Sequence, residues 1–156
     1  MDNLMRKLPI GIQTFEKLRE GDYLYVDKTA LVWRIASTET PYFLSRPRRF
    51  GKSLLLSTFE AYFEGKKELF EGLAIADMEK EWKTYPVFHL DLNAEKYDSP
   101  QALVEILSRQ LTQWELKYGK GEDEETLSGR FAGVIRRACE QSGRGVVVLV
   151  DEYDKP

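Results

Sequence analysis

The residues Gly51-Lys52-Ser53 match the end of a phosphate-binding motif, G-x-x-x-x-G-K-[ST]. A glycine at position 51 lets the backbone approach phosphate oxygens. The Lys52 ammonium would reach the β- and γ-phosphates, and the Ser53 hydroxyl would bind Mg²⁺. The first glycine of the motif is missing, because Arg46 stands at its position. A lone G-K-S at a helix start is common, so the interpretation depends on a second feature.

That second feature is the acidic pair Asp151-Glu152, which follows the aliphatic run VVVLV. Phosphoryl transfer needs a carboxylate that holds Mg²⁺ and a group that orients the attacking water. We assign the first role to Asp151 and the second to Glu152. The predicted catalytic residues are therefore Glu152 and Lys52, and the alternative interpretation of the acidic pair is a solvated turn.

These residues need a strand, a tight loop and a helix to position them, because N–H groups and the helix dipole favour anions at a helix N-terminus. We expect a buried strand over residues 41–44 and a helix from about Lys52 to Phe63, ended by Gly65. Further strands are expected over residues 86–93 and 146–150. Further helices are expected after Ser99-Pro100 and over residues 125–141. Short apolar strands alternating with long helices predict an α/β fold with a parallel sheet.

The loop before Gly51 is strongly basic. Its arginines can be explained as a solvated surface, as a nucleic-acid contact, or as positive charge brought to the phosphates, and the sequence leaves these explanations open. The predicted nucleotide-binding residues are Arg46, Pro47, Arg48, Arg49, Phe50, Gly51, Lys52, Ser53 and Leu54.

Composition limits the other functions. A chain of 156 residues forms one modest domain, and a net charge of −3 argues against a dedicated nucleic-acid-binding surface. Cys139 is the single cysteine and is predicted to be a buried structural thiol, and His89 is the single histidine, so a His/Cys metal site is not expected. No signal-peptide pattern or membrane-spanning run is present in the sequence, which predicts a cytoplasmic protein without a membrane partner.

Four motifs in order resemble the bacterial AAA-ATPase-like family of P-loop ATPases: Y-V-D-K-T, R-P-R-R-F-G-K-S, G-K-K-E-L-F-E-G-L-A-I and V-D-E-Y-D-K-P. The resemblance runs from Leu8 to Pro156, and in that family an arginine at the position of Arg46 is the normal form. It implies a three-layer α/β/α P-loop NTPase fold of the additional-strand catalytic-glutamate type. It also implies ATP and Mg²⁺ as cofactors, with Ser53 and Asp151 as metal ligands.

The resemblance also implies an organisation of the chain. The strand order would be 5-1-4-3-2, and the strand between residues 41–44 and 146–150 is not in this sequence, so we expect the N-terminal part of a longer ATPase, truncated after the acidic-motif strand. Residues 1–38 are predicted to form an arm and a first helix, and residues 39–156 a partial ATPase core, continuous with the arm as one domain. By analogy, the segment Tyr25–Thr29 would lie near the adenine; the alternative is a helix cap at Asp27 beside a core aromatic residue.

The leading functional hypothesis is ATP binding, with Mg²⁺-dependent hydrolysis in the complete protein. One alternative is a nucleotide-gated regulatory switch. Another is the ATPase module of a DNA-processing protein, because members of the resembled family often carry a nuclease-like C-terminal domain of the PD-(D/E)xK type, through which DNA would be a partner. A small-molecule kinase is disfavoured by Glu152, which suits water activation. The sequence does not identify a protein partner.

Overall fold

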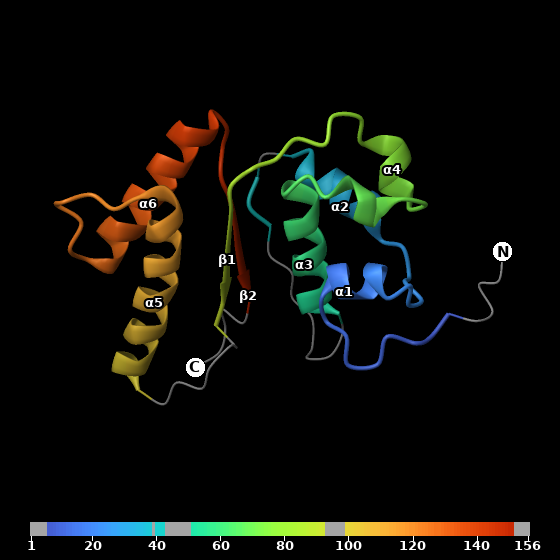
Figure 1. Ribbon diagram of the computed structural model, residues 1–156, viewed down its shortest axis with the longest axis horizontal. Helices are drawn as coiled ribbons and strands as arrows, with labels where there is room; N and C mark the ends of the chain where they lie inside the picture. The colour runs from blue at the N-terminus through green and yellow to red at the C-terminus, as the bar shows by residue number, and fades with distance from the viewer. Residues whose placement is uncertain (1–5, 39, 43–50, 93–98, 152–156) are drawn as a thin grey trace. The chain divides into compact units, whose positions relative to one another are not determined.

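The computed structural model describes residues 6–38, 40–42, 51–92 and 99–151. The chain forms two compact units, residues 1–84 and residues 85–156, whose α-helices and strands are labelled in Figure 1. The predicted division at residues 38 and 39 separates an arm from a catalytic core by function. The unit boundary does not test that division, which stays a prediction.

The first unit is helical. Its elements are α1 (Phe15–Glu20), α2 (Thr29–Ala36), α3 (Lys52–Phe63), the short 3₁₀ helix η2 (Lys67–Phe70) and α4 (Ala74–Met78). The core consists of apolar side chains from all five elements, and its fully buried members are Phe15, Leu18, Val32, Phe70 and Ile75. The rings of Phe15 and Phe70 pack with centroids 4.8 Å apart, and this contact joins α1 to η2.

Helix α3 begins at Lys52 and ends at Phe63, as the sequence predicts. Its C-terminal stop is Gly65, which has φ +72°. The Gly65 N–H donates to the Tyr62 carbonyl and the Lys66 N–H donates to the Ala61 carbonyl, both at 3.1 Å. This pair of bonds is the Schellman motif, in which glycine supplies the left-handed residue.

The second unit contains a small parallel sheet and two long helices. Strand β1 (Val87–Asp91) is followed by α5 (Pro100–Tyr118), α6 (Leu127–Ser142) and β2 (Val147–Asp151). The two strands are parallel and in register from Val87 opposite Val147 to Asp91 opposite Asp151. They are the expected strands over residues 86–93 and 146–150, which are neighbours in the predicted order.

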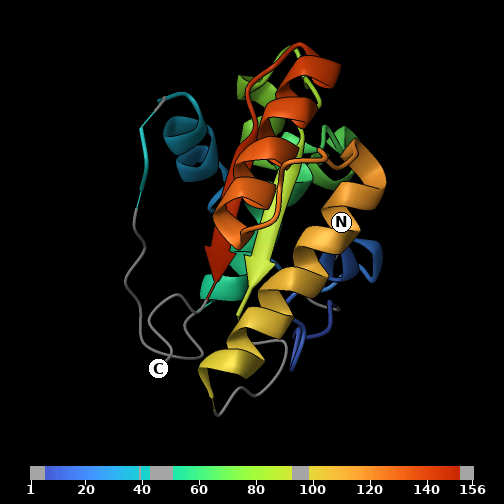
Figure 2. The ribbon, with the colours of Figure 1, turned by 90° about the vertical axis from the view of Figure 1, so that its left-hand side faces the viewer.

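Helices α5 and α6 lie together on one face of this pair of strands, as Figure 2 shows. Phe88 of β1 forms a core with Leu111, Val134 and Ala138 of the two helices. Ser99 caps α5 by accepting from the Ala102 N–H at 3.2 Å, as predicted. Helix α6 begins two residues later than predicted, because Thr126 is its N-cap residue and accepts from the Gly129 N–H at 3.0 Å.

The expectation for Cys139 is wrong, and the expected strand over residues 41–44 is contradicted at its two described residues. Cys139 is exposed rather than buried, because the buried face of α6 passes through Val134 and Ala138 and the next residue points about 100° away from it. Pro41 and Tyr42 belong to no strand, and Tyr42 is exposed; the rest of the predicted strand over residues 41–44 lies outside the described residues. The fold is thus a mixture of helix and strand with a two-stranded parallel sheet.

Candidate functional site

The predicted phosphate-binding residues lie at the N-terminus of α3. Gly51 is the N-cap residue with φ +79°, a conformation that explains the glycine because other residues are strained there. Lys52 and Ser53 are the first two residues of the helix and are half-buried. The first N–H groups of an α-helix have no acceptor in a preceding turn of the same helix, and helix N-termini therefore commonly bind anions.

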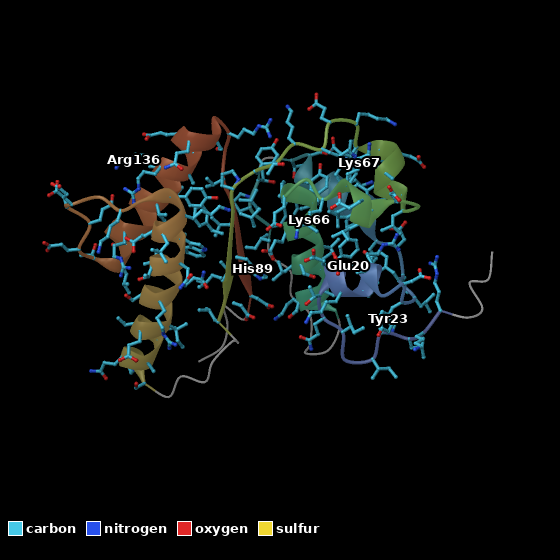
Figure 3. The ribbon with its side chains drawn as sticks, viewed as in Figure 1. Glu20, Tyr23, Lys66, Lys67, His89 and Arg136 are labelled. Atoms are coloured by element: carbon cyan, nitrogen blue, oxygen red, sulfur yellow. The ribbon has the colours of Figure 1, made fainter. Side chains whose placement is uncertain are left out.

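A lysine lies near each end of α3, and the helix dipole favours a cation at the C-terminal end only. At the C-terminal end, Lys66 lies 3.2 Å from Glu64 and 3.4 Å from Glu16 and is labelled in Figure 3; a cation is favourable there. At the N-terminal end, the described first turn contains Lys52 and no acidic residue. Since the dipole favours negative charge at this end, an anion bound beside Lys52 would be stabilised by both.

The first turn of α3 is connected to the N-terminal segment of the chain. The Phe15 N–H donates to Ser57 Oγ at 2.9 Å. The hydroxyls of Ser57 and Thr58 donate to the Leu54 carbonyl at 2.8 and 2.7 Å. Burial raises the pKa of the Tyr25 hydroxyl, which is also hydrogen-bonded to Thr58.

Asp151 ends β2 and is buried, with 4% of its surface exposed. Its carbonyl accepts from the Leu92 N–H at 3.2 Å, which holds the carboxyl ends of the two strands together. Ligands of parallel sheets bind at this end of the strands. Lys52 and Ser53 belong to the first unit and Asp151 to the second. Residues 46–50 and Glu152 lie outside the described residues.

Asp91 is a candidate residue that the sequence reasoning missed. It ends β1 and is paired in register with Asp151, and residues in register on neighbouring strands point to the same face of a sheet. The signal was available, because V-F-H-L-D is an apolar strand that ends in a carboxylate, as is V-V-L-V-D. His89, labelled in Figure 3, lies on β1 two residues before Asp91.

The segment Tyr25–Thr29 has contacts of the helix-cap type. Asp27 Oδ1 accepts from the Thr29 N–H at 2.9 Å and from the Thr29 hydroxyl at 2.6 Å, although the N-cap residue of α2 is Lys28 rather than Asp27. The Tyr25 ring packs against Phe15, with ring centroids 5.3 Å apart. Asp27 is thus not the N-cap residue that the alternative interpretation expects, but it accepts from the first N–H group of α2, and Tyr25 lies beside a core aromatic residue. The adenine contact stays a prediction.

Asp27 and Thr29 also accept from the first N–H groups of α4. Asp27 Oδ2 accepts from the Ala74 N–H at 2.8 Å, and the Thr29 hydroxyl accepts from the Ile75 N–H at 3.1 Å. Burial opposes ionisation of Asp27, but the hydrogen bonds from Thr29 and Ala74 outweigh it and lower the pKa of this carboxyl. Both carboxylate oxygens are therefore occupied within the chain.

Among residues 6–38, 40–42, 51–92 and 99–151, no helix has both the length and the hydropathy needed to cross a membrane. Over the same ranges, no three histidine, cysteine or acidic side chains gather closely enough to hold a metal ion by themselves.

Comparison with known proteins identifies the family of this chain. A curated relative from Azotobacter chroococcum mcd 1, "Uncharacterized protein in vnfD 5'region", is 45% identical over 152 residues. The match covers 97% of this chain, and the chain spans only 30% of the length of that relative. No solved structure matches. The model of the AAA-ATPase-like family, described as "Predicted AAA-ATPase", matches residues 9–156. The chain therefore belongs to the AAA-ATPase-like family.

Proposed function

We propose that this protein binds ATP together with Mg²⁺ at the N-terminus of α3, and that the complete protein hydrolyses the ATP. The observation that carries the proposal is the start of α3, where Gly51 adopts φ +79° and Lys52 stands in a first turn without acidic residues. Membership of a family described as "Predicted AAA-ATPase" supports the same ligand. The proposed fold of the complete domain is the three-layer α/β/α P-loop NTPase fold.

Each proposed residue has one role. Lys52 binds the β- and γ-phosphates, and the backbone N–H groups of the first turn of α3 donate to phosphate oxygens. The basic residues Arg46, Arg48 and Arg49 add positive charge beside the triphosphate. Glu152 orients the water that attacks the γ-phosphate.

The residues proposed to hold Mg²⁺ suit this ion. Ser53 supplies a hydroxyl and Asp151 a carboxylate, and Mg²⁺ prefers oxygen ligands, with one or two carboxylates and phosphate oxygens completing the set. Asp91 places a second carboxylate at the same end of the sheet as Asp151. When bound, the ion neutralises charge on the phosphates.

The test is nucleotide binding by variants, measured with a fluorescent ATP analogue and Mg²⁺. We expect Lys52→Ala to weaken binding by roughly tenfold to a hundredfold, because a hydrogen bond to a charged group contributes about 1.5–3 kcal/mol. The matched control is Lys67→Ala, which removes an exposed lysine of η2 and should leave the affinity unchanged. Glu152→Gln should retain binding and lose turnover. Equal affinities of the wild type and Lys52→Ala would refute the proposed phosphate site.

A further inference from the structure

Ser57 links α3 to the start of α1 through one hydroxyl group. Its Oγ lies 2.9 Å from the Phe15 nitrogen, 2.8 Å from the Leu54 carbonyl and 3.4 Å from the Gln13 carbonyl. A hydroxyl has one proton to donate and two lone pairs that accept. Ser57 therefore donates to Leu54, the nearer carbonyl, while it accepts from the Phe15 N–H.

The Phe15 N–H belongs to the first residue of α1, whose N-terminal donors need an external acceptor. In the part of the chain that the structure describes, the N-cap residue Thr14 supplies no side-chain capping bond. Ser57 of another helix takes this role. The same hydroxyl also binds the carbonyl of Leu54, which lies in the first turn of α3 beside Ser53.

We propose that Ser57 is a positioning residue for nucleotide binding, because it holds the first turn of α3 against α1 before the nucleotide arrives. This inference rests on the proposed function. Ser53 and Ser57 are four residues apart, so they lie on the same face of the helix, one turn from each other. Donors that are already held in place lose less conformational freedom when a ligand binds, so the Ser57 bonds increase the affinity of the first turn for phosphate.

Thr58 provides a matched control on the neighbouring position of α3. Its hydroxyl also donates to the Leu54 carbonyl, at 2.7 Å, and its side chain is buried. It lies about 100° around the helix from Ser57. Thr58→Val removes a hydroxyl from the same carbonyl, together with its hydrogen bond to Tyr25, and keeps the side-chain volume. Ser57→Ala instead removes the acceptor of the Phe15 N–H.

The experiment compares wild type, Ser57→Ala, Ser57→Thr and Thr58→Val as purified 156-residue proteins. The affinity for a fluorescent ATP analogue with Mg²⁺, the melting temperature, and the amide hydrogen exchange of residues 52–55 without nucleotide are measured. We expect Ser57→Ala to bind about two- to tenfold more weakly, the effect of one hydrogen bond, and to exchange these amides faster. Ser57→Thr, which keeps a hydroxyl, should restore the affinity. Thr58→Val should lower the melting temperature and leave the affinity unchanged.

Two results would overturn the inference: an unchanged affinity in Ser57→Ala, or equal losses of affinity in Ser57→Ala and Thr58→Val. A wild-type protein without Lys52-dependent binding would instead refute the proposed function itself, so the two failures are distinguishable. If Ser57→Ala does not fold, Ser57→Cys takes its place, because a thiol keeps the volume and is a weaker donor. An affinity of Ser57→Cys equal to that of the wild type would then count against the inference.

Discussion

Glu124, in the loop between α5 and α6, is bound to Arg137 at both carboxylate oxygens. The Arg137 guanidinium donates to Oε2 at 2.7 Å and to Oε1 at 2.8 Å, and the Gly121 N–H donates to Oε1 at 3.2 Å. The hydrogen bonds from Arg137, opposed by burial, lower the pKa of the Glu124 carboxyl from 4.5 to about 2. A bidentate pair of this kind is stronger than an ordinary ion pair because two bonds form in parallel.

The lowered pKa predicts a pH dependence of stability at this residue. Because the folded pKa lies below the unfolded value of 4.5, the pair stabilises the protein fully above that pH and its contribution is lost as the pH falls to about 2. Glu124→Gln should therefore lower the melting temperature at pH 7, and its difference from the wild type should shrink between these two pH values. The control is Glu122→Gln, at an exposed position of the same loop. A difference that stayed constant down to pH 2 would contradict the assignment.

At the scale of elements, α4 depends on contacts from elsewhere in the chain. A helix of five residues has little stability of its own, and its first two N–H groups donate to Asp27 and Thr29. Arg19 of α1 supports the preceding turn, where its guanidinium donates to the Leu69 and Glu71 carbonyls at 2.8 and 2.7 Å. The Y-V-D-K-T motif therefore has a structural role in the first unit.

We predict that Asp27→Ala lowers the free energy of unfolding by about 1–2 kcal/mol, the cost of losing a helix cap. Asp77→Ala removes an exposed carboxylate of α4 itself and should change that free energy by less than about 0.5 kcal/mol. Urea unfolding followed by tryptophan fluorescence measures both variants. Equal effects of the two substitutions would show that the contacts to Ala74 and Thr29 contribute nothing to stability.

Local signals predicted the elements better than they predicted the contacts between them. The limits of α3 follow from Gly51 and Gly65, and the start of α5 follows from Ser99-Pro100, because caps act within a few residues. The capping of α4 by Asp27 joins residues 47 positions apart, which no local pattern encodes. The pairing of Asp91 with Asp151 likewise depends on strand register. The exposure of Cys139 depends on which face of α6 packs against the sheet.

At the scale of the whole molecule, the residues proposed to bind ATP and Mg²⁺ belong to both units. Lys52 and Ser53 are in the first unit and Asp151 is in the second. Trp33 and Trp82 lie in the first unit and Trp114 in the second, so tryptophan fluorescence can follow the unfolding of each unit separately. Trp82 packs near Phe70 in the first unit, with centroids 5.2 Å apart, and Trp114 packs against Phe88 in the second, at 4.9 Å.

We predict that ATP and Mg²⁺ raise the unfolding temperatures of both units. A ligand at a hundred times its Kd stabilises the protein by about 2.7 kcal/mol. One protein carries Trp114→Phe and reports on the first unit; another carries Trp33→Phe and Trp82→Phe and reports on the second. In an Asp151→Asn background the ligand should still raise the unfolding temperature of the first unit, and it should raise that of the second unit much less. Shifts unaffected by Asp151→Asn would refute its assignment as a magnesium ligand.

The exposure of Cys139 has a practical consequence. Because it is the only cysteine of the sequence and lies on the surface of α6, a maleimide dye would attach at one defined point without any prior mutagenesis. The dye would sit on the helix face away from Val134 and Ala138, so the core of the second unit would remain intact. The unmodified chain thus already carries a labelling handle for following its second unit in single-molecule or anisotropy measurements.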